Sequence, residues 1–79
     1  MTSRVTFLTR EGCHLCEDAL VVVAQVCREL GVDWVEVDID ADPNLLERYN
    51  EQVPVVLVDG AQHAFWHVDE TRLRRALGG

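Results

Sequence analysis

The first half of the chain combines a short strand-like run with a long helical period. Residues 4–9 (Arg-Val-Thr-Phe-Leu-Thr) are rich in β-type side chains and predict a strand. From His14 to Leu30, apolar residues return at steps of three and four, which predicts a helix that ends at Gly31. The apolar positions of this helix are Leu15, Ala19, Val22, Val23, Val26, Cys27 and Leu30.

The next segment, from Asp33 to Asp40, alternates between two sets of residues. The set on one face is Val35, Val37 and Ile39, and the set on the other is Trp34, Glu36 and Asp38. This period of two predicts a half-buried strand at the edge of a sheet. Asp42 and Pro43 then predict the start of a short helix, with Asp as its N-cap, that continues to Tyr49.

A continuous apolar run from Pro54 to Val58 predicts a central strand that is covered on both faces. The dipeptide Asp59-Gly60 predicts a two-residue hairpin turn, and residues 62–66 supply the returning strand. Asp69 is the expected N-cap of a last helix. The inner face of that helix is expected to carry Leu73, Ala76 and Leu77.

These segments follow one another in the order βαβαββα. The first βαβ unit must be parallel with a right-handed crossover, and the last two strands form an antiparallel hairpin. A four-stranded mixed sheet with helices on both faces satisfies both constraints, and this α/β arrangement is the thioredoxin-like architecture. A chain of 79 residues forms one domain, 1–79, with a core of modest size.

Charge and hydropathy argue against two classes of binding partner, nucleic acids and membranes. Fourteen acidic residues against seven basic ones, all Arg, give a net charge of −7, which argues against binding to nucleic-acid phosphates. Arg72, Arg74 and Arg75 lie near the end of the last predicted helix, where they complement its dipole. No apolar run is long enough to cross a bilayer, and Met1 to Arg4 show no signal-peptide pattern. We therefore expect a cytoplasmic monomer that binds neither nucleic acid nor membrane.

Two of the three cysteines form a Cys-His-Leu-Cys motif where the first helix begins. On a helical turn, the spacing of Cys13 and Cys16 places their Cα atoms about 5 Å apart, within the range of a disulfide. At the first position, unpaired helix N–H groups and the helix dipole favour a thiolate, and such sites lower a cysteine pKa to about 3.5–7.5. Cys13 is therefore the expected nucleophile, and Cys16 the expected resolving thiol. In a cytosolic chain, this motif between a strand and a helix favours redox chemistry over metal binding.

Neighbouring charges act on that thiolate in both directions. Arg10 and a protonated His14 would stabilise it, and we expect His14 to tune the reactivity of the pair. The carboxylates that would oppose the thiolate belong to Glu11, Glu17 and Asp18. We expect the helix terminus to prevail, so that the pKa of Cys13 is lowered.

The remaining cysteine and the late aromatic and histidine residues have simpler interpretations. Cys27 lies about 16 Å further along the same helix, too far for a disulfide to the motif, so it is expected to be a buried hydrophobe. The spacing of His63 and His67 does not place both beside the cysteines, so no metal site is expected. Phe65 and Trp66 are expected in the core, although the fold would bring them near the dithiol.

Residues 7–16 (Phe-Leu-Thr-Arg-Glu-Gly-Cys-His-Leu-Cys) resemble the opening of the glutaredoxins. In that family a strand, a basic residue three positions before the first Cys, and Cys-x-x-Cys follow in this order. Gln52-Val53-Pro54 resembles the family's Thr-Val-Pro, and Asp59-Gly60 matches its hairpin. The likeness extends over nearly the whole chain and is strongest to the small bacterial glutaredoxin-like proteins.

The resemblance implies a role for each matching residue. Besides the nucleophile and the resolving thiol, it implies that Arg10 contacts a substrate carboxylate, that Val53 offers main-chain hydrogen bonds, and that Pro54 is cis beside the dithiol. The sequence departs from the family most at the element that binds glutathione. Residues 65–69 (Phe-Trp-His-Val-Asp) replace the Gly-Gly-x-Asp element that holds glutathione, and only Asp69 matches it.

Two functions follow from these observations as alternatives. The first is a thiol–disulfide oxidoreductase without a bound cofactor, which acts on a disulfide-containing protein or a small thiol. Its electrons would come from glutathione as a co-substrate or from a reductase, and the altered residues 65–69 favour the reductase. The second is a soft-metal module like the small metallochaperones, or an iron–sulfur protein, that uses the same cysteines. Metallochaperones have the order βαββαβ, which ends in a strand and not in a helix.

Overall fold

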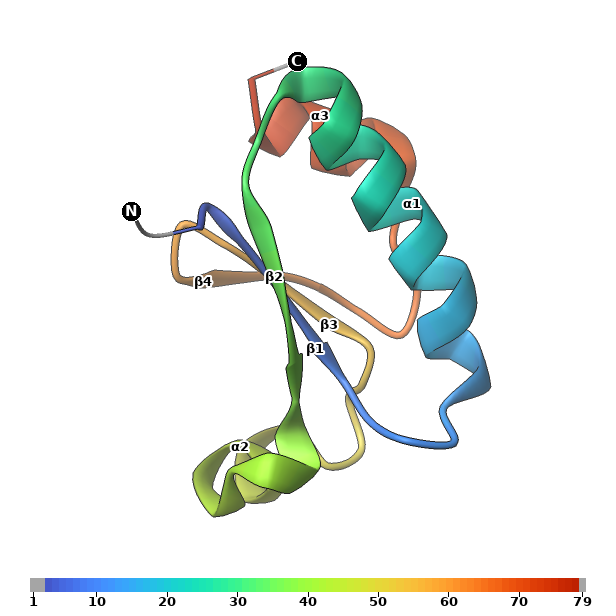
Figure 1. Cartoon of the computed structure of the whole chain (residues 1–79), viewed down its shortest axis with the longest axis vertical. Coiled ribbons are helices and arrows are strands. Elements are labelled where there is room, and N and C mark those ends of the chain that lie inside the picture. The colour runs from blue at the N-terminus through green and yellow to red at the C-terminus, as the bar shows by residue number, and fades with distance from the viewer. Residues whose placement is uncertain (1–2, 79) are drawn as a thin grey trace.

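A computed structural model describes residues 3–78, so residues 1, 2 and 79 of the predicted 1–79 domain lie outside the described residues. The elements follow the predicted order βαβαββα, with one additional 3₁₀ turn. They are β1 (Val5–Thr9), α1 (His14–Leu30), β2 (Trp34–Asp38), the turn η1 (Ile39–Ala41), α2 (Pro43–Tyr49), β3 (Val55–Val58), β4 (Ala61–Phe65) and α3 (Glu70–Ala76). Figure 1 shows the strands crossing the middle of the molecule.

The sheet has the order β2-β1-β3-β4 and is mixed, as predicted. β1 pairs parallel to β2 and antiparallel to β3, and β4 returns antiparallel to β3. Asp59 and Gly60 form the predicted hairpin turn with φ of 51° and 86°, the positive values that a type I′ turn requires. Because Leu8 pairs with Val55, the chain leaves β1 at the same end of the sheet at which it enters β3.

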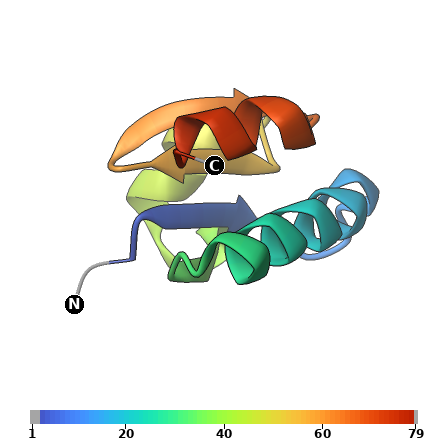
Figure 2. The same cartoon turned by 90° about the horizontal axis from the view of Figure 1, so that it is seen from above.

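Each face of the sheet carries its own hydrophobic cluster. The first cluster joins Phe7 and Val56 of the sheet to the inner face of α1 and to Leu73 of α3. The second joins Leu8 and Val55 to Ile39, Tyr49 and residues of α2. In Figure 2, α1 and α3 accordingly lie on one side of the sheet and α2 on the other. The predicted arrangement of helices on both faces is confirmed.

The predicted strand 33–40 is too long at its C-terminal end. The Asp38 carboxylate accepts the backbone N–H of Asp40 at 2.9 Å, which turns the chain into η1 and places Ile39 in that turn, fully buried. The alternation itself is confirmed, because Trp34 packs against the α1 cluster and Val37 against the α2 cluster. Val35 is 43% exposed.

Four residues that were expected inside lie outside. Leu15 is 44% exposed at the first turn of α1, and Ala76 faces solvent at the end of α3. Phe65 and Trp66 are 46% and 50% exposed, because they stand where β4, the edge strand, leaves the sheet. Cys27, by contrast, is buried as predicted. Between residues 3 and 78, no helix has the length and apolar character needed to span a membrane.

Candidate functional site

The two motif cysteines lie at the N-terminus of α1, where the sequence predicted them. Cys13 is the N-cap residue, with extended backbone angles, and its Sγ accepts the backbone N–H of Cys16 at 3.2 Å. The two side chains form a disulfide, and their Cα atoms are 5.3 Å apart. Gly12 has φ of 79°, a left-handed conformation that turns the chain from β1 into the helix. The local turn therefore holds both sulfur atoms at one helix end.

The two cysteines differ in access. Cys16 is 5% exposed and belongs to the cluster beneath α1, whereas Cys13 is only half-buried. A partner from solvent thus reaches the Cys13 sulfur first. This asymmetry agrees with the expected nucleophile and resolving roles, which stay predictions.

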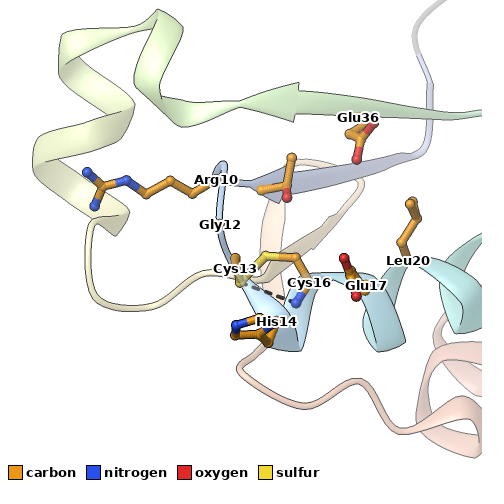
Figure 3. Close-up of a pocket in the computed structure, with 9 residues that line it drawn as sticks. Arg10, Gly12, Cys13, His14, Cys16, Glu17, Leu20 and Glu36 are labelled. Carbon is orange, nitrogen blue, oxygen red and sulfur yellow. Dashed lines mark hydrogen bonds between the residues drawn. A yellow bond between two sulfur atoms is a disulfide. The ribbon is translucent and has the colours of Figure 1, made fainter.

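A pocket of about 220 Å³ opens beside this pair (Figure 3). Its walls come from the end of β1, from the first turns of α1 and from β2. The lining residues are Thr9, Arg10, Gly12, Cys13, His14, Cys16, Glu17, Leu20 and Glu36. His14, which was expected to tune the dithiol, lies next to it and is exposed. Sequence reasoning missed Glu36, although its pairing opposite Phe7 in a parallel ladder places it on the α1 face.

Arg10 is directed away from the dithiol. Its guanidinium pairs with Asp40, with Nε 3.1 Å from Oδ1, and donates a further hydrogen bond to Oδ1 of Asn50. Figure 3 shows the side chain extending toward α2. The predicted contact between Arg10 and a substrate carboxylate would require this side chain to exchange its present partners for the substrate.

The segment before β3 lies at the same end of the sheet as the dithiol. The Val53–Pro54 peptide bond is cis, as the resemblance implied. Val53 packs against the cluster that contains Cys16. Within residues 3–78 its backbone N–H and C=O make no hydrogen bond to another residue. The main-chain contacts predicted for Val53 are therefore open, and they stay a prediction.

Residues 65–69 form another loop at the end of the sheet where the dithiol lies. Trp66 has a left-handed backbone with φ of 66°, donates its backbone N–H to Pro54 O at 2.9 Å, and donates its indole N–H to Glu51 O at 2.8 Å. These two bonds tie the loop to Pro54 and to Glu51, three residues before it. Asp69, the one residue that matches the family's glutathione element, accepts the backbone N–H of Arg72 as the N-cap of α3. Its carboxylate is therefore engaged within the chain.

The other titratable side chains are separate from the dithiol. Burial raises the pKa of the Cys27 thiol, which fits an unreactive core residue. Burial also lowers the pKa of His63, with a smaller contribution from Arg72. No three His, Cys, Asp or Glu side chains in the described part of the chain are grouped as metal ligands would be.

The position of Cys13 leads to a direct prediction about its reduced form. The N-cap site and the N–H of Cys16 should stabilise a thiolate, so its pKa should lie below the value of about 8.5 of a free cysteine. Thiolate absorbance at 240 nm, recorded against pH on the reduced protein, measures it. The same titration of the Cys13→Ser variant supplies the baseline. A midpoint at or above the free value would contradict the prediction.

Comparison with known proteins identifies the relatives of the chain. The family model of the glutaredoxin-like domain (DUF836) matches residues 4–78. Over 76 residues, the chain is 40% identical to uncharacterized protein Rv0508 of Mycobacterium tuberculosis and equally to uncharacterized protein Mb0520 of Mycobacterium bovis. Each alignment covers 90% of this chain and 78% of the mycobacterial protein.

Solved structures agree in fold. Protein XcR50 from X. campestris superposes with a TM-score of 0.75 at 32% identity, covering 94% of this chain and 95% of that one. Thioredoxin 1 from Thermosipho africanus superposes with a TM-score of 0.67 at 13% identity, covering 94% and 89% of the two chains. At this low identity, the similarity to thioredoxin 1 shows a shared fold and not a shared function.

Proposed function

The chain belongs to the glutaredoxin-like domain family, and from this premise we propose that it is a thiol–disulfide oxidoreductase with Cys13 and Cys16 as its working dithiol. The observation that carries the proposal is the disulfide-forming pair at the N-terminus of α1. Cys13 is partly exposed, and Cys16 is buried one turn further along. A structural disulfide that links neighbouring turns of one helix closes a very short loop and would constrain the unfolded chain little.

The proposed reaction transfers two electrons from the protein to a substrate disulfide. The Cys13 thiolate attacks one sulfur of the substrate, forming a mixed disulfide and releasing the other half as a thiolate, which takes a proton from water. Cys16 then loses its proton and attacks the Cys13 sulfur. The Cys13–Cys16 disulfide forms, the second half of the substrate leaves as a thiol, and the protein is oxidised.

We propose a reductase, rather than glutathione, as the electron donor that regenerates the dithiol. Trp66 and His67 occupy the loop where the glutaredoxins have two glycines. The Asp69 carboxylate caps α3. Bulky side chains at these positions reduce the space for a tripeptide. Because the pair must be reduced again after each turnover, the proposed working compartment is the reducing cytoplasm.

A donor assay tests the proposal. Reduction of a neutral model disulfide would be followed by NADPH consumption, once with glutathione and glutathione reductase and once with thioredoxin reductase. We expect turnover that depends on the protein, with the higher rate in the thioredoxin reductase arm. Higher turnover with glutathione would overturn the donor assignment. Absence of turnover in both arms, together with tight binding of a soft metal, would favour the metal-binding alternative.

A further inference from the structure

The pocket beside the dithiol is lined by two glutamates that form no ion pair within residues 3–78. Glu17 of α1 and Glu36 of β2 both border it (Figure 3). Both side chains are exposed.

The arginine of this pocket does not offset these charges. The guanidinium of Arg10 points away from the dithiol and is held by Asp40 and Asn50. The acidic lining also continues beyond the pocket. An adjoining hollow shares Thr9, Arg10 and Glu36 with it, and adds Glu11 and Asp38. Carboxylates therefore line both hollows on the β2 side of the dithiol.

We propose that Glu17 and Glu36 make the site selective for disulfides that carry positive charge next to the sulfur atoms, such as a disulfide flanked by basic residues in a protein. This inference rests on the proposed function. In the first step a thiolate must approach the substrate sulfur within this negatively lined pocket. A cationic substrate gains attraction from both carboxylates there, whereas an anionic one, such as oxidised glutathione, is repelled.

Three small disulfides of similar size provide the test. Cystamine carries two positive charges, 2-hydroxyethyl disulfide none, and 3,3′-dithiodipropionate two negative charges. The second-order rate constant for oxidation of the reduced protein by each would be divided by the rate constant for free 2-mercaptoethanol with the same disulfide. This division removes the intrinsic reactivity of each compound. Ratios between compounds also cancel a uniform change in the nucleophilicity of Cys13.

We expect the normalised rate constant for cystamine to exceed that for dithiodipropionate by about tenfold at low ionic strength, with the neutral compound between them. In 0.5 M salt the preference should shrink to about twofold or less, because the screening length falls to a few ångströms. In the double variant Glu17→Gln/Glu36→Gln, the low-salt preference should fall several-fold.

A control variant removes one negative charge outside the pocket. Asp33 is exposed and precedes β2, at the opposite end of that strand from the dithiol, and Asp33→Asn should keep the wild-type preference. A wild-type ratio near one, or a ratio that survives in the double variant, would overturn the selectivity while leaving the oxidoreductase proposal intact. If none of the three disulfides oxidises the reduced protein, the proposed function itself fails.

Discussion

Replacing Cys13 with serine is expected to lower disulfide-reductase turnover by about three orders of magnitude or more, because a serine hydroxyl is not ionised near neutral pH and cannot replace the thiolate. Replacing Cys16 with serine should act differently. The partly exposed Cys13 can still attack, but no second thiol resolves the product. A mixed disulfide should therefore accumulate, and intact-protein mass spectrometry should find one substrate thiol attached per chain.

Cys27→Ala serves as the control for both variants. Cys27 is buried and its thiol pKa is raised, so its removal leaves the dithiol chemistry unchanged and tests for unspecific thiol effects. A thermal melt of each variant checks that it is folded. The assigned roles would be reversed if Cys13→Ser, and not Cys16→Ser, trapped the substrate. Full turnover in the Cys13→Ser variant would refute the dithiol mechanism altogether.

The fold could be predicted because its signals are local. The period of α1, its left-handed Gly31 cap, the Asp42-Pro43 helix start and the Asp59-Gly60 turn each act within a few residues. The end of β2 was missed for a reason that is also local. The Asp38 carboxylate accepts the backbone N–H of Asp40, two residues later. Asp often forms turns in this way, and such a turn competes with an extended strand in the segment 33–40.

The site could be predicted only in part, because much of it depends on distant contacts. The Cys13–Cys16 spacing determines its own geometry, and the observed Cα separation matches the expected one. The orientation of Arg10 depends on Asp40 and Asn50, which lie 30 and 40 residues further along the chain. No pattern around Arg10 itself indicates that these partners will reach it.

The exposure of the late aromatic residues has a similar origin. Phe65 and Trp66 were expected inside because aromatic side chains usually contribute much of a core. Here β4 is an edge strand that ends at Phe65, and Trp66 bonds through its indole to Glu51 O in a loop on the surface. Which strand lies at the edge is a property of the whole sheet, so the local sequence around these residues could not reveal it.

Truncation of Phe7 to alanine should lower the free energy of unfolding by about 3–5 kcal/mol. Phe7 is fully buried on β1, and it belongs to the cluster that holds α1, α3 and Cys16 together. A chain of this length has a total stability of roughly 4–12 kcal/mol, so the loss is a large part of what is available. Urea unfolding followed by tryptophan fluorescence measures the change.

The matched variant Phe65→Ala removes the same atoms from a side chain that is 46% exposed on the edge strand β4. Its expected cost is about 1 kcal/mol or less, since much of that ring already contacts water. Because Phe7 and Cys16 share one cluster, Phe7→Ala should also make Cys16 reachable by alkylating reagents in the reduced protein, whereas Phe65→Ala should not. Equal losses of stability in the two variants would mean that the cluster beneath α1 does not hold the dithiol end of the helix in place.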